Sequence, residues 1–234
     1  MTLSATHPAR VPVDYQQAQR AQELLVRRRL RGELPDLLWL LEHPPTITWG
    51  SSGGLDNLLM SQEELRARGI ALVPSGRGGD VTFHEPGQLV GYPIVDLRAP
   101  ADRDLHKYLR SLEEALLVFL EGVAIHAHRI AGRTGIWLEG TPPRKIAAMG
   151  VRLKKWVTSH GFALNVENQL KGFGLIVPCG IRDGAVTSLA RELGEQQQIV
   201  RWEDVVKSVH GGMEKALGRP LKVLIGREGL DAKL

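Results

Sequence analysis

Apolar residues recur at helical spacing along five stretches of the chain. Between residues 104 and 121 several leucines and Phe119 fall on one face, which predicts the strongest helix, and Gly122 should end it. A capping box of Ser61 and Glu64 marks the start of a shorter helix that should end near Gly69. The other helices are expected from the N-cap Asp14 to a point before Pro35, from Thr187 or Ser188 to Gly194, and over residues 202–217.

The remaining apolar runs are short and are bounded by glycine, proline or histidine, as β-strands are. Residues 123–166 alternate such runs with turn residues, which is typical of an antiparallel meander. Strands are expected at 37–42, 46–49, 70–73, on both sides of a glycine loop within 77–97, at 124–128, 135–138, 146–153, 156–160 and 162–166, and after Pro220. We therefore predict one α+β domain over residues 1–234, with a mostly antiparallel or mixed sheet and helices packed against it. Residues 1–13 and about 226–234 are expected to be flexible.

The composition is that of an ordinary soluble globular protein, with 43% hydrophobic and 24% charged residues in 234. A net charge of +4 and a pI near 9.4 favour acidic partners. Basic residues are not interleaved with aromatic ones, so we expect no nucleic-acid partner. One cysteine allows no internal disulfide, and no apolar run reaches the roughly 20 residues of a membrane span. With no signal-peptide core at the start, the cytoplasm is the expected location.

The only cysteine, Cys179, lies between Pro178 and Gly180 at the end of an apolar run. Proline restricts the backbone before the thiol, and glycine permits a sharp turn with no side-chain bulk beside it. This arrangement can present a nucleophile. A lone cysteine is more often a small buried hydrophobic residue, so Cys179 by itself does not establish catalysis.

The segment from Arg77 to Pro93 combines four glycines with an arginine, two carboxylates and a histidine. Backbone N–H groups at Gly78 and Gly79 can bind a carbonyl or phosphate oxygen. The alternative is a hairpin with tight turns, but a glycine loop with Arg and His is more polar than a plain turn requires. No Gly-Lys-Ser/Thr follows, and no long helix opens here. The segment is therefore neither a phosphate loop nor a dinucleotide-binding fingerprint.

Two later stretches also carry chemistry. Lys145 begins a strand on which Ala147, Met149 and Val151 should share its face. A lysine among small and apolar residues is partly desolvated and suited to proton transfer, but on this stretch alone an ordinary lysine that reaches to solvent is the better interpretation. His160 is either catalytic or a hydrogen-bonded residue of the core.

The remaining histidine pair does not predict a metal centre. His126 and His128 share a strand face, but the sequence clusters no cysteine or carboxylate ligands with them, so no metal site is expected.

Taken in order, these stretches resemble the octanoyltransferases of protein lipoylation. The resemblance extends from about Leu37 to Leu189. Glu85 stands where that family usually has glycine, Asp80 where it often has a neutral or basic residue, and residues 141–144 form a longer turn. The matching residues are 41–45 with Thr48, 77–79 with Thr82 and His84, 86–89 with Tyr92 and Pro93, 145–147 with Gly150 and Val151, 156–158 with His160, Gly161 and 163–166, then 178–181 and 186–189.

The resemblance implies a fold like that of biotin and lipoate protein ligases. It implies transfer of an octanoyl group from octanoyl-acyl carrier protein to a lysine of lipoyl domains, those of 2-oxoacid dehydrogenases and of glycine cleavage H protein. This is the first step of endogenous lipoate synthesis, and it would proceed through a cysteine acyl-thioester without a cofactor. A monomer that binds no membrane is expected.

The same resemblance assigns site residues. Cys179 and Lys145 match the catalytic pair. The positions that match the acyl-binding segments are Arg77, Gly78, Gly79, Asp80, Val81, Thr82, Phe83, His84, Ala148, Met149, Gly150, His160, Gly161, Phe162 and Ala163.

Three other functions remain open from the sequence. An ATP-dependent lipoate or biotin protein ligase would share the fold, but it would need an adenylate-binding loop and no Cys179. A cysteine hydrolase would need a third group to orient a Cys–His pair, for which His160 is available. A non-enzymatic module that binds a carrier protein or RNA would leave Lys145 and Cys179 without a role.

Overall fold

The structure is a computed structural model that describes residues 10–177, 184–194 and 200–231. Its centre is a mixed sheet with the strand order β11-β1-β5-β9-β8-β7-β6, in which β10 also pairs with β8; a smaller sheet has the order β3-β2-β4. The strands are β1 Leu37–Leu41, β2 Thr46–Trp49, β3 Ala71–Pro74, β4 Val81–His84, β5 Gln88–Ile94, β6 Ala127–Ile130, β7 Arg133–Leu138, β8 Arg144–Lys154, β9 Val157–Asn165, β10 Ala185–Val186 and β11 Lys222–Ile225.

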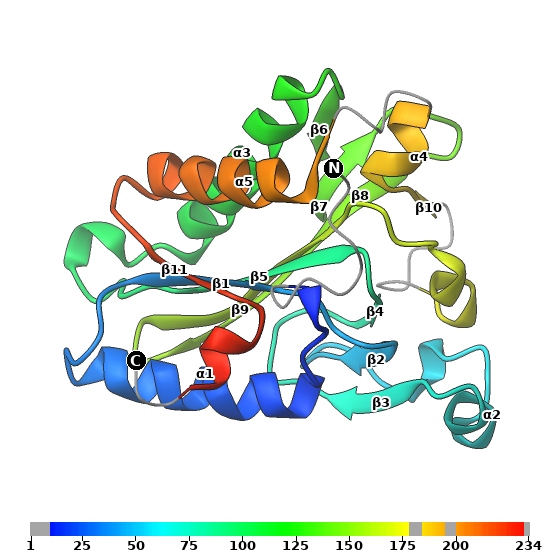
Figure 1. The fold of residues 1–234 in the computed structure, drawn as a ribbon, viewed down its shortest axis with the longest axis horizontal. Helices are drawn as coiled ribbons and strands as arrows, with labels where there is room; N and C mark the ends of the chain where they lie inside the picture. The colour runs from blue at the N-terminus through cyan, green and yellow to red at the C-terminus, as the bar shows by residue number, and fades with distance from the viewer. Residues whose placement is uncertain (1–9, 178–183, 195–199, 232–234) are drawn as a thin grey trace.

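The helices lie on both faces of the large sheet (Figure 1). α1 (Tyr15–Leu30) covers one face, and α3 (Leu105–Gly122) with α5 (Trp202–Leu217) covers the other. Each face therefore has its own hydrophobic core, and the strands between them are buried. Two shorter helices lie elsewhere: α2 (Gln62–Ala67) is near the smaller sheet, and α4 (Leu189–Leu193) is beside β10.

The local start and stop signals are confirmed. The side chain of Asp14 accepts a hydrogen bond from the Gln17 N–H at the start of α1, and Ser61 forms its capping box with Glu64 at the start of α2. Ser188 caps α4 in the same way. The mixed sheet and the helices packed on it confirm the predicted α+β class.

One predicted strand boundary is wrong. Residues 156–166 were expected to form two strands, whereas β9 runs without a break from Val157 to Asn165 and pairs with β8 along its length. Gly161 does not end a strand, because it faces Gly150 in the β8–β9 register. An added Cβ on Gly161 would lie 2.3 Å from the carbonyl oxygen of Gly91 on β5, so glycine here permits close packing of neighbouring strands.

The described terminal segments have more contacts than the sequence led us to expect. Val13 is 1% exposed, and its N–H donates to the carbonyl oxygen of Glu42 at 2.8 Å. Near the other end, residues 226–230 form a turn of 3₁₀ helix, η7 (Gly226–Leu230), and Gly226 accepts a hydrogen bond from the indole of Trp39. Val13 and Gly226 are thus hydrogen-bonded to residues of the core strands or of the turn that follows them.

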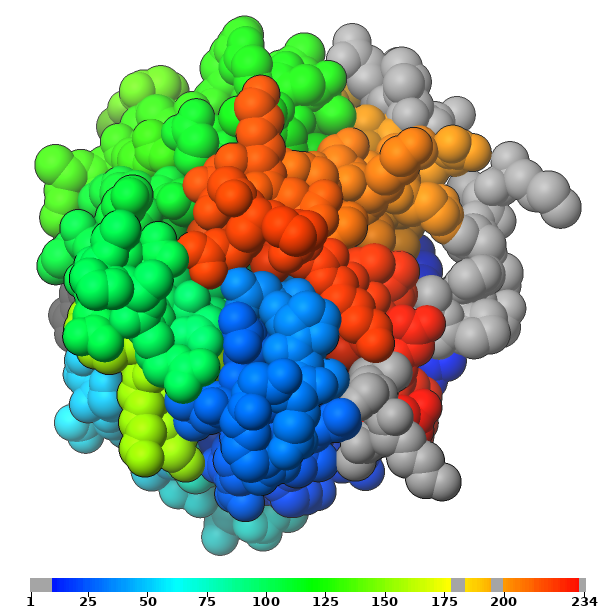
Figure 2. Space-filling view, turned by 90° about the vertical axis from the view of Figure 1, so that its left-hand side faces the viewer, coloured from blue at the N-terminus to red at the C-terminus, as the bar shows by residue number. Residues whose placement is uncertain are grey.

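A salt-bridge cluster joins three distant segments at one end of the sheet. The Arg219 guanidinium binds the carboxylates of Asp36 at 3.1 Å and Asp102 at 2.7 Å. Figure 2 shows this face, where the blue, green and orange-red parts of the chain lie side by side.

Candidate functional site

An apolar pocket lies where the small sheet meets β5, β8 and β9. It encloses about 460 Å³, including the part that opens to solvent. Small residues on the two long strands, Ala148, Gly150, Gly161 and Ala163, give it width. The remaining lining residues are Tyr15, Arg77, Gly79, Thr82, His84, Val90, Tyr92, Met149, His160 and Phe162. The lining surface is mainly apolar, although several lining residues carry polar groups, and such a surface suits a straight hydrocarbon chain.

Buried polar rings lie around this pocket. The Nδ1 of His43 donates to the Val13 carbonyl at 2.5 Å, so its Nε2 accepts from the Tyr92 hydroxyl at 2.7 Å. The Nδ1 of His84 donates to Gln88 Oε1 at 2.8 Å, and the ring of Tyr15 stacks on His84 at 5.5 Å. These contacts fix the ring orientations.

The histidines around the pocket are neutral near pH 7. Burial lowers the pKa of His43 to about 4 and that of His160 to about 3. Burial also holds the pKa of His84 well below its ordinary value, and the charge of Arg77 lowers the pKa of His84 and of His160 further. The pocket is therefore compatible with an uncharged acyl chain.

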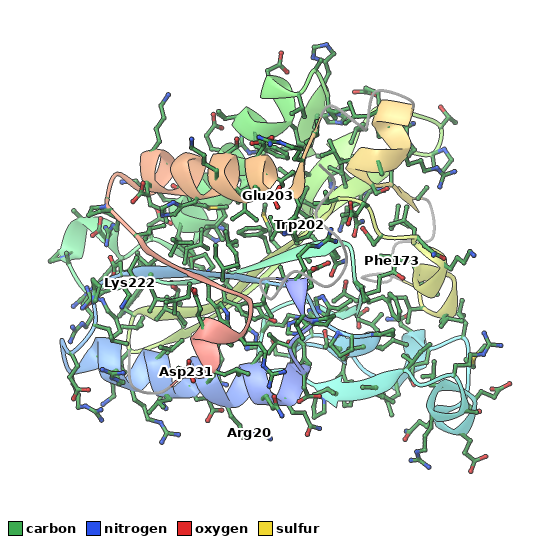
Figure 3. All side chains as sticks on the ribbon, viewed as in Figure 1. Arg20, Phe173, Trp202, Glu203, Lys222 and Asp231 are labelled. Atoms are coloured by element: carbon green, nitrogen blue, oxygen red, sulfur yellow. The ribbon has the colours of Figure 1, made fainter. Side chains whose placement is uncertain are left out.

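Lys145 lies beside a second, smaller cavity of about 320 Å³, again including open space. The lysine is only 9% exposed, and its Nζ lies 4.6 Å from the centre of the Trp137 ring. This distance is that of a cation–π contact. The cavity is also lined by Phe173 of η4 (Lys171–Leu175), which Figure 3 labels at the edge of the molecule.

The two cavities adjoin. Thr82, Ala148 and Ala163 line both of them. A ligand whose chain fills the apolar pocket would therefore have its other end in the cavity of Lys145. This contiguity is the main geometric feature of the site.

The prediction of which β8 residues share a face with Lys145 is wrong. Ala147 was expected beside Lys145, but Ala147 lies in the core under α3, while Lys145 and Ala148 share a cavity. The cause is a bulge: Trp137 pairs with Lys145 and the preceding Ile136 with Ala147, so Ile146 is an extra residue on β8. The bulge reverses the alternation and lets Lys145 and Ala148 face the same side.

Gly135 lies opposite this bulge. Its φ is +119°, and an added Cβ would lie 2.6 Å from the Ala147 carbonyl oxygen and 3.4 Å from Cε of Lys145. The Gly135 N–H donates to the buried carboxylate of Glu113 on α3 at 3.2 Å. Glycine is thus required where β7 supports Lys145.

A chain of side-chain hydrogen bonds crosses the strands below the cavity of Lys145. Gln88 Nε2 donates to Asn165 Oδ1 at 2.9 Å, and Asn165 Nδ2 donates to the Thr187 carbonyl at 2.9 Å. The Thr187 N–H in turn donates to the Lys145 carbonyl at 3.0 Å. These bonds join β5, β9 and the segment after β10 to the lysine backbone.

The glycine loop before β4 does not act as the sequence led us to expect. The Gly78 N–H donates to the Val151 carbonyl at 2.8 Å, so it is not available to a ligand. Arg77 instead fixes the loop, because its Nη2 donates to the carbonyl and the hydroxyl of Thr48 at 2.9 and 3.0 Å. Asp80 accepts a hydrogen bond from the side chain of Asn57.

The alternation along β4 decides which of its residues face the pocket. Thr82 and His84 line it, whereas Val81 and Phe83 face a separate core with Ile47. Of the expected acyl-binding residues, Gly78, Asp80, Val81 and Phe83 are therefore outside the pocket lining, and the structure brings the other eleven together.

Three lining residues were not among those expected. Val90 and Tyr92 lie on β5 within a motif that carried the family resemblance, so their alternation with Gly91 could have identified them. Tyr15 reaches the pocket from α1, and Trp137 reaches Lys145 from β7. No local signal marked these last two.

Glu85, which departs from the family pattern, has a structural contact. Its Oε1 accepts hydrogen bonds from Asn168 Nδ2 at 3.1 Å and from the Leu170 N–H at 2.8 Å. Leu170 has a φ of +65° and precedes η4. Glu85 therefore anchors the segment that leads toward Cys179.

Cys179 itself lies outside the described residues. Within the described ranges, no group of three or more histidine, cysteine, aspartate or glutamate side chains is placed to hold a metal ion. Over the same ranges, no helix has the length and apolarity needed to cross a membrane.

Comparison with known proteins places the chain in a family. The lipoyl protein ligase A/B catalytic domain matches residues 14–212. A protein named octanoyltransferase from Koribacter versatilis is 50% identical over 184 residues, which cover 78% of this chain and 73% of that protein. Another octanoyltransferase, from Caldicellulosiruptor bescii, is 45% identical over 220 residues, 93% of each chain.

Solved structures share the fold at low identity. Lipoate-protein ligase A bound with ATP has a TM-score of 0.69 at 15% identity and covers 95% of this chain and 90% of its own. A bipartite lipoate protein ligase from Thermoplasma acidophilum has a TM-score of 0.70 at 14% identity, covering 95% and 88%. These likenesses confirm the predicted ligase-like fold. Because identity to the octanoyltransferases reaches about half of the aligned residues over most of the chain, the protein belongs to the octanoyltransferases of the lipoyl protein ligase A/B family, which are acyltransferases.

Proposed function

We propose that this protein transfers an octanoyl group from octanoyl-acyl carrier protein to a lysine of a lipoyl domain, through a thioester on Cys179. The acceptors would be the lipoyl domains of 2-oxoacid dehydrogenases and glycine cleavage H protein. The observation that carries the proposal is the contiguity of the apolar pocket with the cavity of Lys145, through the shared residues Thr82, Ala148 and Ala163.

The pocket suits the acyl chain and the cavity suits the reacting end. A saturated chain in the pocket would lie against small residues and neutral rings, at little desolvation cost. Its carbonyl would then lie near Lys145, a buried amine whose Nζ lies over the Trp137 ring. Val186, which pairs with Lys145 through β10 and β8, is seven residues beyond Cys179 in the sequence.

The reaction would proceed in two steps. The Cys179 thiol gives its proton to Lys145, and its thiolate attacks the thioester carbonyl of the donor; a new C–S bond forms, the C–S bond to the carrier breaks, and the carrier thiolate takes the proton from Lys145. The amine of the acceptor lysine then attacks the enzyme thioester, a C–N bond forms and the thiolate of Cys179 is released. Lys145 would stabilise the thiolate when charged and accept the amine proton when neutral.

An ATP-dependent ligase is the competing function, because a lipoate-protein ligase bound with ATP shares the fold. That likeness is at 15% identity, whereas the octanoyltransferases are 45–50% identical. A net charge of +4 also suits acidic carrier and lipoyl domains.

The test is to mix the protein with a lipoyl domain and octanoyl-acyl carrier protein, with and without ATP. We expect the mass of the lipoyl domain to increase by one octanoyl group at the same rate in both reactions. Modification that requires free octanoate or lipoate together with ATP would contradict the proposal. A lipoyl domain whose acceptor lysine is replaced by arginine is the matched control.

A further inference from the structure

Three cavities follow one another along the β8–β9 hairpin. The cavity of Lys145 comes first and the apolar pocket second. A third, outer cavity of about 470 Å³, including open space, lies between α1 and the far part of the hairpin. Its walls include Gln19, Gln22 and Val26 of α1 with Arg152, Ser159 and His160 of the strands.

His160 is the one residue that lines both the apolar pocket and the outer cavity. It is 4% exposed and lies between them. The ring also meets the Tyr92 ring edge-on, with centroids 6.1 Å apart. No other described residue lines both of these spaces.

The backbone holds His160 in an unusual conformation. Its φ is +55°, a value that few residues other than glycine and asparagine adopt. The His160 N–H donates to Oε1 of the buried Gln22 at 2.7 Å, which fixes this conformation. Nδ1 of the ring has no hydrogen-bond partner within the described parts of the chain. The ring is thus placed by the backbone and by packing.

The apolar pocket leads from the cavity of Lys145 toward His160. Ala148 and Ala163 lie next to the cavity of Lys145, and His160 is three residues from Ala163 along β9. At about 3.3 Å per residue this is a run of about 10 Å. The uncharged ring of His160 at the far end would face the methyl terminus.

We propose that His160 is the end wall of the acyl pocket and sets the longest chain that the enzyme transfers. Removal of the ring would join the pocket to the outer cavity, between α1 and the β8–β9 turn, and a longer saturated chain would extend into it. This inference rests on the proposed function, because it assigns the direction of the acyl chain from the position of Lys145.

The test compares octanoyl- and dodecanoyl-acyl carrier protein as donors for the wild type and for His160→Gly. Glycine adopts the positive φ without strain, so the variant should fold. We expect the ratio of kcat/KM for dodecanoyl to that for octanoyl transfer to rise at least tenfold. Ser159→Ala, which alters the outer cavity alone, is the matched control and should leave the ratio unchanged.

His160→Asn is the second variant, because asparagine also tolerates a positive φ and is shorter than histidine. An unchanged ratio in both folded variants, with an active wild type, would overturn the end-wall role and leave the proposed function intact. Failure of the wild type with octanoyl-acyl carrier protein would instead overturn the proposed function. Tighter binding of free dodecanoate to His160→Gly, measured by calorimetry, would support the end wall independently of turnover.

Discussion

At the scale of single residues, the site is defined by how Lys145 is buried. A lysine that is 9% exposed needs a favourable contact for its charge, and the face of Trp137 supplies one. The sequence indicated a lysine among small residues but not its aromatic partner. Trp137 is on a different strand, and the pairing that brings it to Lys145 is a tertiary feature.

Lys145→Met should abolish most of the activity. Methionine fills similar space without an amine, so we expect octanoyl transfer to fall at least about 100-fold, the usual contribution of an acid–base group, with little loss of stability. The rate is measured with a lipoyl domain as acceptor, and folding by thermal unfolding. A rate within a few-fold of wild type in the folded variant would exclude Lys145 from proton transfer.

His43 should make stability depend on pH. Its pKa is about 4 in the folded protein and near 6.5 in the unfolded chain. Between these values the unfolded state binds more protons, so the free energy of unfolding should fall as the pH falls from about 6.5 toward 4. The total loss from this group is on the order of 3 kcal/mol.

Urea unfolding at several pH values tests this expectation. His43→Gln should show a shallower decline below pH 6.5, although it should be less stable at pH 7.5. Some decline should persist, because His84 and His160 are shifted in the same direction. An equally steep decline in the variant would show that His43 is not the residue responsible.

At the scale of elements, the bulge in β8 decides which residues face the site. Simple alternation from Lys145 predicted Ala147, Met149 and Val151 on its face, and the extra residue Ile146 made this wrong for Ala147 and Val151, which lie together in the core under α3. Alternation is a local rule, whereas a bulge depends on the partner strand. The bulge requires a glycine at position 135, where φ is positive, but a glycine in a sequence does not by itself locate a bulge.

Gly135→Ala tests the role of the bulge. The new Cβ would require a strained φ and would clash with the Ala147 carbonyl. We expect the free energy of unfolding to fall by about 1–3 kcal/mol. Because Lys145 would move, we also expect kcat of the folded variant to change more than its KM. Gly132→Ala is the control, since it also has a positive φ but has nothing within 4 Å of the added Cβ. Equal kinetic effects in both variants would contradict this role.

At the scale of the whole molecule, the sequence predicted well which stretches share the site. It predicted less well how the helices and strands that carry them pack together. The motif around Arg77 is far in the chain from those around Lys145 and His160, and the family resemblance implied that they share a site. The structure brings most of these residues to one pocket. The contribution of α1 through Tyr15 could not be predicted, because it depends on how the helix packs on the sheet.

The same limit applies to the parallel pairings within the large sheet. Capping residues and periodicity predicted the helices, since these signals are local. The parallel pairing of β11 with β1 and of β10 with β8 joins segments that are far apart or separated by loops. Neither pairing leaves a pattern within its own short strand.

The most direct test of the central claim is intact-protein mass spectrometry after mixing with octanoyl-acyl carrier protein in the absence of a lipoyl domain. The wild type should gain one octanoyl group that hydroxylamine removes, and Cys179→Ala should gain none. Adding a lipoyl domain should transfer the group from the enzyme to its lysine. An octanoyl group that persists on Cys179→Ala, or a lipoyl domain modified at full rate by that variant, would contradict the thioester mechanism.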